Sequence, residues 1–512
     1  MFQAKKTLIL ILALLMVLTA FAACDRGTPD AGPEESESSQ TSTDDGTGNT
    51  DNKNDSILNG VSFEGTTLFL LKGNAVELDE YIEELTEGAS LVEKAIFDRC
   101  DYAETRLKLR TQWTPVADAS LVETADLSNS TGGTYDIIVN KSSRSAALMT
   151  RGVLSNLTQY PYLDFDSEGW ATSLLSDVMV GNKLYFATGD ISPNLLFMTS
   201  VVFFNKDLVE TLGINEKIQT NWDKTDLYEL VTSGTWTLDK MVTLCEDVYA
   251  DKNNSGFKDT GDRFGFNTYS QLLENFYYGG NHTVIVPDGD GFILSQDFMN
   301  PILVGDILET VNGLLHDSND GFLEKGQKQH NYDETRLNFS EGNVLFCMAP
   351  ASHAYNTHSN TEKLNYGVLP VPKHSESQEN YACTQSFPYC MYSITSQGKN
   401  RVPASAFMQA LSEESYTTTR PALLDKMMKG RYAEEPQDAE MWDYAVDSNI
   451  FDVGRVFQEL FNDPTEGYLT INLFRARIEG DNENWSVILD TYGMPMAWTA
   501  ADLAGQIMAL PD

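Results

Sequence analysis

Short apolar runs alternate with amphipathic helical segments over most of this chain, and that alternation constrains the fold more than any other feature. Residues 67–71 (TLFLL) and 135–139 (YDIIV) are typical of buried strands. Between these two runs, Ser90 and Glu93 have the spacing of a helix capping box. The alternation predicts an α/β fold with mainly parallel sheets, in which ligands bind beyond the carboxyl ends of the strands.

The length and two amphipathic patterns refine this prediction. A chain of 512 residues exceeds the roughly 250–300 residues at which single cores stop growing, so we expect two lobes. One amphipathic helix should follow Ser90, and Thr237 should cap another. The residues expected to face inward are Leu91, Ala95, Ile96, Ala103 and Leu107 in the first helix and Leu238, Met241, Cys245 and Val248 in the second.

Residues 1–23 are predicted to be an export signal. Lys5 and Lys6 precede an apolar stretch, and two alanines stand directly before Cys24. This arrangement resembles the lipobox of bacterial lipoproteins, which implies that Cys24 carries the lipid that anchors the mature chain. The alternative is a membrane anchor helix, for which the 17-residue run 7–23 is at the short limit of about 20 residues.

Residues 24–60 are predicted to be a disordered acidic tether, because almost no apolar side chain is available there to form a core. This segment holds nine acids and two bases, so most of the net charge of −40 lies on the globular part. Nucleic-acid binding depends on clustered Lys and Arg, so this charge excludes a nucleic-acid partner and disfavours anionic ligands. Neutral solutes and divalent cations remain compatible with it.

The number of cysteines argues against a disulfide scaffold, and the absence of known catalytic motifs argues against an enzyme. Five cysteines remain after Cys24, an odd number, so we expect small buried hydrophobic residues, with a Cys383–Cys390 pair as the alternative. The sequence contains no G-x-S-x-G elbow, no phosphate-binding G-x-x-x-x-G-K-[ST] loop and no H-E-x-x-H motif. We therefore predict a protein that is not an enzyme and has no catalytic cofactor.

Residues 251–262 (DKNNSGFKDTGD) match the pattern of a calcium-binding loop. Gly256 stands at the sixth position, where the loop turns sharply. The predicted ligands are Asp251, Asn253, Ser255, the Phe257 carbonyl, Asp259 and Asp262. Such a calcium ion would be structural, with an affinity in the weak extracellular range of about 10⁻⁴ to 10⁻³ M. The alternative interpretation is a solvated turn rich in Asn and Asp.

Five segments together resemble a known family. They are residues 181–186 (GNKLYF), 201–208 (VVFFNKDL), 234–240 (GTWTLDK), 341–346 (EGNVLF) and 365–373 (NYGVLPVPK). Their order and spacing are similar to those of extracellular solute-binding proteins of ABC importers, the sugar-binding, maltose-binding-protein-like family 1.

The resemblance implies a two-lobed periplasmic-binding-protein-like (type II) fold, with hinge-linked lobes and a central ligand cleft. Lobe one would hold residues 61–195 and about 390–512, although the C-terminal part matches the family least. Lobe two would hold residues 196–389, including the calcium-like loop. The resemblance also implies a monomeric lipoprotein on the extracellular face of the cytoplasmic membrane, which captures a sugar and delivers it to an ABC transporter permease.

The family also suggests ligand residues by their position. The turn after the predicted strand 135–139 and the aromatic residues near the expected crossovers are the candidates. The predicted ligand-binding residues are Asn140, Lys141, Ser143, Arg144, Asp190, Trp236, Tyr277, Tyr278 and Tyr389. The alternatives are helix capping by Ser142 or Ser143, a hydrophobic staple for Trp236 and core packing for the tyrosines.

Two other functions stay open at this point. A peptide- or other-solute-binding lipoprotein of the same fold would lack stacked aromatic rings in its cleft. An extracellular hydrolase would need two carboxylates facing each other at about 5 to 10 Å. Residues 350–353 (PASH) lack the tryptophan that the family carries there, which argues against a maltodextrin-like stacking mode.

Overall fold

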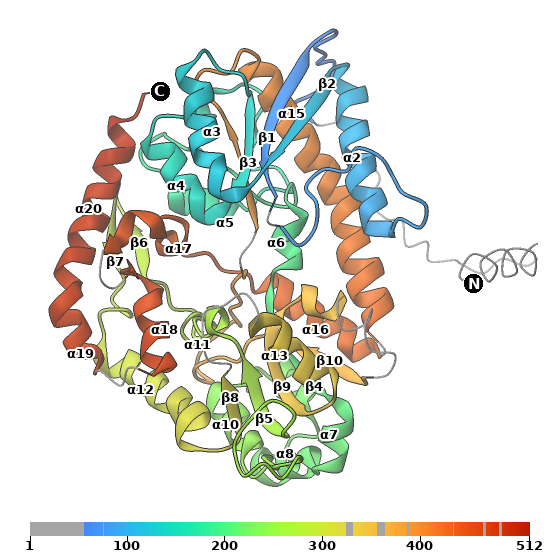
Figure 1. The fold of residues 1–512 in the computed structure, drawn as a ribbon, viewed down its shortest axis with the longest axis vertical. Helices are drawn as coiled ribbons and strands as arrows, with labels where there is room; N and C mark the ends of the chain where they lie inside the picture. Colours follow the sequence, from blue (N-terminus) through green and yellow to red (C-terminus); the bar gives the residue numbers. More distant parts are fainter. Residues whose placement is uncertain are drawn as a thin grey trace, which may run out of the picture. The chain divides into compact units, whose positions relative to one another are not determined.

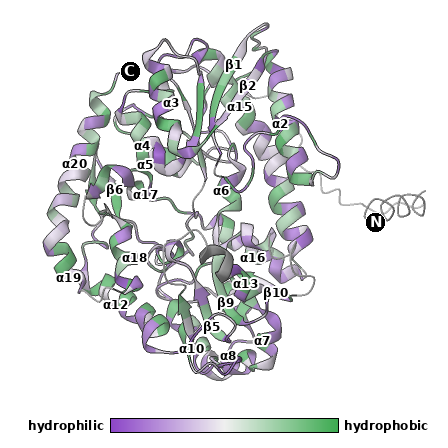
Figure 2. Ribbon diagram, viewed as in Figure 1, coloured by the Kyte–Doolittle hydropathy of each residue, from purple (hydrophilic) through white to green (hydrophobic). Residues whose placement is uncertain are grey.

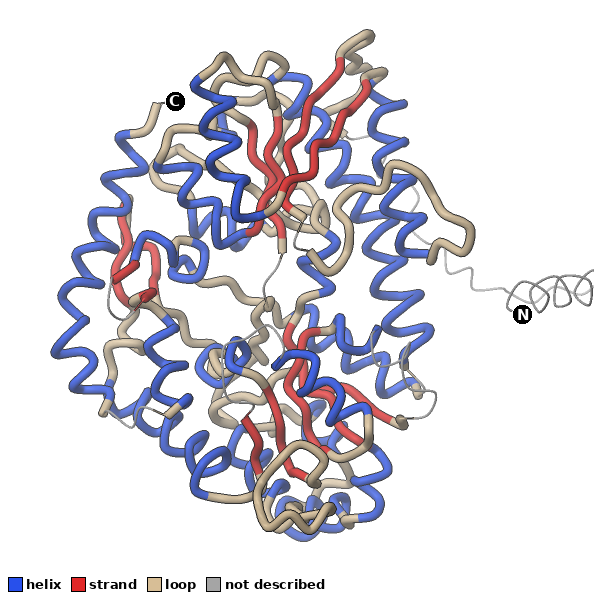
Figure 3. Tube along the Cα trace, viewed as in Figure 1, coloured by secondary structure: helices blue, strands red, loops and turns tan. Residues whose placement is uncertain are grey.

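The computed structural model describes residues 56–511, except 75, 324–330, 356–363, 387–388, 434, 464–466 and 481–483. The described residues belong to one compact unit, Ser56–Asp512. The predicted export signal, Cys24 and most of the predicted tether lie outside the described residues. Two sheets, each flanked by helices, organise this unit (Figure 1 and Figure 3), and we call the parts built on them lobe one and lobe two.

Lobe one is built on a four-stranded sheet with the order β11-β3-β1-β2. β1 pairs in parallel with β2 and β3, and β11 pairs antiparallel with β3. The strands are β1 (Thr67–Gly73), β2 (Arg110–Val116), β3 (Ile137–Lys141) and β11 (Cys390–Ile394). The helices packed around them include α2 (Leu91–Leu107), α3 (Asp118–Ser130), α4 (Ser142–Thr150) and α15 (Arg401–Glu414).

The start of α2 follows from its sequence. Ser90 accepts a hydrogen bond from the Glu93 amide, and the Glu93 side chain accepts one from the Ser90 amide, so the predicted capping box is confirmed. Four of the five residues expected to face inward are buried. The exception is Leu91, which is 55% exposed, because it is the first residue of the helix and lies beyond the core-facing stripe.

Lobe two is built on a five-stranded sheet with the order β10-β4-β9-β5-β8. β5 pairs in parallel with β8 and β9, but β4 pairs antiparallel with both β9 and β10. The strands are β4 (Ser200–Asn205), β5 (Phe264–Thr268), β8 (Gly321–Leu323), β9 (Val344–Pro350) and β10 (Tyr366–Leu369). The prediction of mainly parallel sheets is therefore wrong for lobe two, since β4 enters the sheet from lobe one in the opposite direction.

Helices surround the lobe-two sheet, and the strands carry mainly hydrophobic residues (Figure 2). The helices are α7 (Lys206–Thr211), α8 (Ile214–Trp222), α9 (Leu227–Thr232), α10 (Leu238–Cys245), α11 (Asn275–Tyr278), α12 (Pro301–Asn312) and α13 (Asn331–Ser340). Thr237 precedes α10 as predicted, but its hydroxyl bonds to Asp239 instead of capping the helix. The segment 181–186, one of the five that resemble the family, forms no strand, and Lys183 makes an isolated bridge with Val180.

The C-terminal part of the chain does not belong to lobe one alone. After α15 and two π-helical segments, α16 packs on β10 of lobe two, so the predicted boundary is wrong there. Later elements return toward lobe one, where the Tyr185 hydroxyl donates to the Pro511 carbonyl at 3.0 Å. These elements are η5 (Ser415–Thr419), η6 (Ala422–Tyr432), α16 (Pro436–Asp447), α17 (Val453–Val456), α18 (Ile471–Glu479), α19 (Trp485–Ile488) and α20 (Met494–Ala509).

The body of the protein begins earlier than predicted. Leu58 is 1% exposed, and the Ser56 hydroxyl donates to the Glu413 carboxylate at 2.8 Å. Ser56 and Leu58 thus attach this segment to the body, and the predicted tether, which extended to residue 60, is too long at that end. No helix in the described part of the chain is long and apolar enough to cross a membrane.

The five cysteines after Cys24 are free thiols, and all are buried. The interpretation as small core residues is therefore confirmed, and the alternative Cys383–Cys390 disulfide is not formed. Cys383 lies beside the lobe-two sheet, whereas Cys390 begins β11 of lobe one. The two cysteines are thus held by different lobes.

Candidate ligand-binding site at the lobe junction

Three segments connect the lobes and pair with one another. The first crossing segment is residues 191–200, the second is residues 383–392 without 387–388, and the third is residues 448–452. Thr199 and Gln385 form an antiparallel bridge, and Cys383 and Asn449 form a parallel one. Near lobe two, the three crossing segments therefore form a continuous backbone ladder.

The crossing segments join the edges of the two sheets at which ligands bind in α/β proteins. In lobe one, the carboxyl ends of β1, β2 and β3 lie at the edge where β11 begins, and Cys390 pairs there with Lys141. In lobe two, the carboxyl end of β9 lies beside the start of β4, where Pro350 pairs with Ser200. Both ligand-binding edges therefore face the lobe junction, and polar residues there are the candidates for ligand contact.

Asn140 lies at this edge of lobe one, on β3 opposite Met391 of the second crossing segment. Its side chain is buried, with 4% of the residue exposed, and its amide nitrogen has no hydrogen-bond partner among the described residues. An unsatisfied buried donor costs roughly 1–3 kcal/mol. Asn140 is therefore a buried donor with unused hydrogen-bonding capacity at this edge of lobe one.

The other residues of the predicted turn are partly committed to ion pairs. Lys141 lies 2.7 Å from the Asp118 carboxylate, and Arg144 lies 4.0 Å from Glu459. Ser143 is half-buried in the first turn of α4. No side chain caps this helix, so the alternative that a serine serves as its cap is wrong. Its first amides are available as donors, apart from that of Ser142, which donates to the Tyr389 carbonyl at 3.0 Å.

Asp190 is placed beside the first crossing segment but has a different partner. Its carboxylate accepts a hydrogen bond from Arg420 at 3.2 Å. Burial raises the pKa of Asp190, and the charge of Arg420 opposes that shift. The structure thus gives Asp190 an ion pair within lobe one and does not bring it into contact with the turn at residues 140–144.

Trp236 is a core residue of lobe two, which corrects its prediction as a ligand contact. It is fully buried, its indole nitrogen donates to the Pro370 carbonyl at 3.0 Å, and its ring packs against Phe346. A satisfied polar group and a fully covered ring leave no surface for a ligand.

The tyrosines predicted to stack on a sugar are also buried. Tyr277 donates to the Thr283 carbonyl, and Tyr278 donates to Asp452, both at 2.9 Å. The guanidinium of Arg455 lies 5.7 Å from the centre of the Tyr278 ring. Tyr389 is 1% exposed, and burial raises its pKa. In this structure the three rings serve as packing, so the stacking prediction is wrong for the conformation observed.

Two groups of buried polar residues at the crossing segments were missed from the sequence. Glu80 accepts hydrogen bonds from residues of the first and second crossing segments. On the lobe-two side, the side-chain amide of Gln385 has no hydrogen-bond partner for either of its polar atoms within the described part of the chain, although the residue is fully buried. Glu80 has no local pattern, because its partners in the two crossing segments are more than a hundred residues away in the chain, and nothing adjacent to Gln385 in the sequence signals its burial.

The calcium-like loop has the turn geometry that its sequence predicts. Gly256 has a φ of 75°, and the Asp251 carboxylate accepts hydrogen bonds from the amides of Ser255 and Gly256. Asn253 and Ser255 each bond to the Asp259 carboxylate, at 2.8 and 3.0 Å. The side chains at loop positions 1, 3, 5 and 9 therefore converge, and this oxygen donor set suits calcium.

The last predicted ligand of this loop differs from the others. Asp262 is fully buried, and its carboxylate accepts hydrogen bonds from the Lys252 amide and the Tyr249 hydroxyl. Nowhere in the described ranges are three His, Cys, Asp or Glu side chains grouped closely enough to hold a metal ion. Any ion in this loop would therefore need the amide, hydroxyl and carbonyl oxygens as well as the two carboxylates of Asp251 and Asp259.

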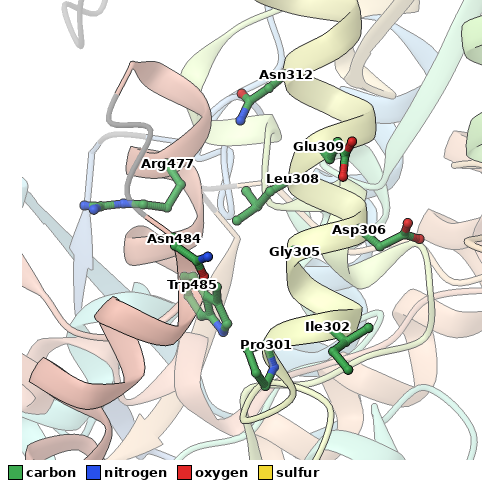
Figure 4. Close-up of a pocket in the computed structure, with 10 residues that line it drawn as sticks. All are labelled: Pro301, Ile302, Gly305, Asp306, Leu308, Glu309, Asn312, Arg477, Asn484 and Trp485. Atoms are coloured by element: carbon green, nitrogen blue, oxygen red, sulfur yellow. The ribbon is translucent and has the colours of Figure 1, made fainter.

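A separate groove of about 490 Å³ lies between α12 and the α18–α19 region (Figure 4). Exposed Ile302 and Glu309 line one wall, and Arg477 and Trp485 line the other. The groove contains none of the predicted ligand residues. The lobe junction therefore remains the candidate site.

Comparisons with known proteins identify the fold. No protein-family model matches the chain, and no curated protein matches it significantly. Among solved structures, the GacH receptor of Streptomyces glaucescens, solved unliganded and with acarbose, is 14% identical with a TM-score of 0.55, covering 85% of this chain and 99% of its own.

Two further solved structures are similar. The galacto-N-biose-/lacto-N-biose I-binding protein of the ABC transporter from Bifidobacterium longum is 12% identical, with a TM-score of 0.53 and coverage of 86% of this chain and 98% of its own. The cyclic α-maltosyl-1,6-maltose-binding protein from Arthrobacter globiformis has the same identity and TM-score, and covers 86% and 99%. All three are binding proteins rather than enzymes. The predicted two-lobed, hinge-linked type II fold is thereby confirmed.

Proposed function

We propose that this protein is a solute-binding protein that captures a carbohydrate at the lobe junction. The observation that carries this proposal is the likeness over nearly the whole chain to proteins solved with, or named for, oligosaccharides. The chemistry at the junction agrees with it, because Asn140 and the first amides of α4 offer uncharged hydrogen-bond donors. Sugar hydroxyls accept such hydrogen bonds without bringing charge into a strongly acidic protein.

The proposal extends to transport. A lipid on Cys24 and a flexible acidic segment would hold the protein at the extracellular face of the cytoplasmic membrane, within reach of an ABC transporter permease. The supporting features are the export-signal pattern before Cys24 and the polar composition of the segment that follows. We propose a monomer without catalytic activity or catalytic cofactor that hands its sugar to that permease.

A structural calcium ion is part of this proposal. Asp251, Asn253, Ser255, the Phe257 carbonyl and Asp259 would hold it at the end of lobe two. The support is the convergence of these side chains around a turn made by Gly256. When bound, the ion would offset the repulsion between the two carboxylates and stabilise the loop before β5.

The decisive experiment is a thermal-shift screen of the chain from residue 25 against mono- and oligosaccharides, with short peptides as the competing ligand class. A bound ligand raises the melting temperature by mass action, and calorimetry then gives its affinity. A shift by sugars and not by peptides supports the proposal. A shift by peptides alone would replace it with a peptide-binding protein of the same fold, and release of a cleaved sugar during incubation would indicate a hydrolase.

A further inference from the structure

One buried carboxylate links two of the three crossing segments. Glu80 is 1% exposed, and its first oxygen accepts hydrogen bonds from the Ser192 hydroxyl at 2.7 Å and the Asn194 amide at 2.8 Å. Its second oxygen accepts a hydrogen bond from the Tyr392 hydroxyl at 2.8 Å. Ser192 and Asn194 belong to the first crossing segment, and Tyr392 ends the second.

The charge of Glu80 is balanced by a buried arginine. Arg99 of α2 is fully buried and lies 3.8 Å from the Glu80 carboxylate. It donates to the Glu80 carbonyl at 2.7 Å and to the Ile191 carbonyl at 2.6 Å. α2 thereby holds both the loop that carries Glu80 and the start of the first crossing segment. Removing one partner from such a buried charged group is costly, because the others remain unsatisfied.

The first and second crossing segments are also hydrogen-bonded to each other beside Glu80. The Ser192 hydroxyl, which donates to Glu80, also accepts a hydrogen bond from the Cys390 amide at 3.2 Å. Asn194 is bonded in turn to the backbone of Leu78, through both its amide oxygen and its amide nitrogen. A side-chain network centred on Glu80 therefore joins the first and second crossing segments on the lobe-one side. The backbone ladder joins them on the lobe-two side.

We propose that Glu80 is the positioning residue of the hinge, because it fixes the lobe-one ends of the first and second crossing segments. The network reaches into the short helix α6 (Pro193–Phe197) through Asn194, and the rest of α6 separates it from the ladder at Thr199. In the first crossing segment, the part of the chain between Asn194 and Thr199 is therefore where bending between the lobes would take place. Glu80 thus sets the relative orientation of the two ligand-binding edges. The inference rests on the proposed function only in that the two edges must close on a ligand.

The test needs no ligand, so its failure is distinguishable from failure of the proposed function. Glu80→Gln removes the charge opposite Arg99, and Glu84→Gln, an exposed residue of the same loop, is the matched control. Both are made in the full chain, purified in detergent. Spin labels are placed at exposed positions of α3 and α13 through Leu127→Cys and Leu337→Cys, since the five native cysteines of the body are buried.

Two measurements then report on the hinge. Amide hydrogen exchange at residues 190–200 and 389–394 is expected to accelerate about tenfold or more in Glu80→Gln, relative to Glu84→Gln. The distribution of distances between the spin labels is expected to broaden in Glu80→Gln and not in Glu84→Gln. A general loss of stability would not broaden it in the native state. Unchanged exchange in both segments together with an unchanged distance distribution would overturn the proposal.

A second variant covers the case in which Glu80→Gln does not fold. Tyr392→Phe removes one hydrogen bond and leaves the carboxylate beside Arg99. It is expected to shift exchange and the distance distribution in the same direction by a smaller amount. If Tyr392→Phe leaves both measurements at the values of the parent chain, Glu80 does not position the hinge.

Discussion

Trp236 donates its indole N–H to the backbone carbonyl of Pro370 at 3.0 Å. This contact lies in the core of lobe two, although the position of Trp236 in the sequence had suggested a ligand contact. Pro370 directly follows β10, whereas Trp236 directly precedes Thr237, the last residue before α10. The hydrogen bond therefore joins a helix start to a strand end. This hydrogen bond stabilises the folded lobe. Mutation of Trp236 should therefore change the stability of the protein and not its affinity for a ligand.

Trp236→Phe is expected to lower the free energy of unfolding by about 2 kcal/mol, because it leaves a cavity and an unsatisfied Pro370 carbonyl. The affinity for a sugar should not change. Trp498→Phe is the matched control, since Trp498 is 71% exposed and should shift stability by less than about 0.5 kcal/mol. Urea unfolding gives the stabilities and calorimetry gives the affinity. A large loss of affinity in folded Trp236→Phe would return this residue to the ligand site.

Asn140→Ala should show the opposite behaviour. The amide nitrogen of Asn140 has no partner among the described residues, so its removal is expected to leave stability nearly unchanged. Loss of one ligand hydrogen bond should weaken sugar binding by roughly 1–1.5 kcal/mol, or about tenfold. Exposed Asn182→Ala serves as the control, and calorimetry with the sugar found in the screen is the measurement. Equal affinities for the two variants would exclude Asn140 from the site.

Calcium is expected to raise the stability of the protein. With an affinity of about 10⁻⁴ to 10⁻³ M, 10 mM calcium should add about 1.4 to 2.7 kcal/mol. Asp251→Asn removes a carboxylate at the first loop position and should abolish this gain. Asp247→Asn, four residues before the loop and exposed, should keep it. Thermal unfolding in calcium and in chelator provides the comparison, and identical melting temperatures in the parent chain would refute a calcium ion in this loop.

Acid should destabilise the protein through His353. Burial, reinforced by the charge of Arg336, lowers the pKa of His353 to about 3. The unfolded chain binds a proton at this residue near pH 6.5, and the folded chain does not, so stability falls as pH decreases below 6.5. The slope from this group approaches about 1.4 kcal/mol per pH unit and ends near pH 3.

His353→Gln is expected to flatten that slope between pH 6.5 and 5, where few carboxylates titrate. Urea unfolding at pH 7, 6 and 5 for the parent and the variant is sufficient to see it. Parallel curves for the two proteins would mean that His353 is protonated in the folded state.

Local sequence patterns predicted much of this fold. The capping box at Ser90 and Glu93, the strand at residues 67–71 and the turn at Gly256 are confirmed because each depends on a few neighbouring residues. The course of the C-terminal segment and the direction of β4 were not predictable in this way. They depend on how many times the chain crosses between the lobes.

In the candidate site, too, some features were predictable from the sequence and others only from the tertiary structure. Asn140, predicted from its position in the sequence, lies on β3 at the lobe junction, and the Tyr389 carbonyl accepts a hydrogen bond from the amide of Ser142 just after that strand. Aromatic residues, however, are equally suited to a core and to a sugar face, so only burial could assign Trp236 and Tyr278 to the core. Glu80 is one of 75 acids and has no distinguishing neighbours.

By itself, the sequence determined the alternation of strands and helices, the acidic surface and the local loop geometry, because these depend on short-range periodicity and composition. Tertiary structure decided which polar groups meet at the junction and which are satisfied there. Glu80 and Tyr392 are 312 residues apart in the chain, yet they share a hydrogen bond. Such a contact exists only once the chain has returned to lobe one and β11 has paired with β3, because only then are both side chains buried together.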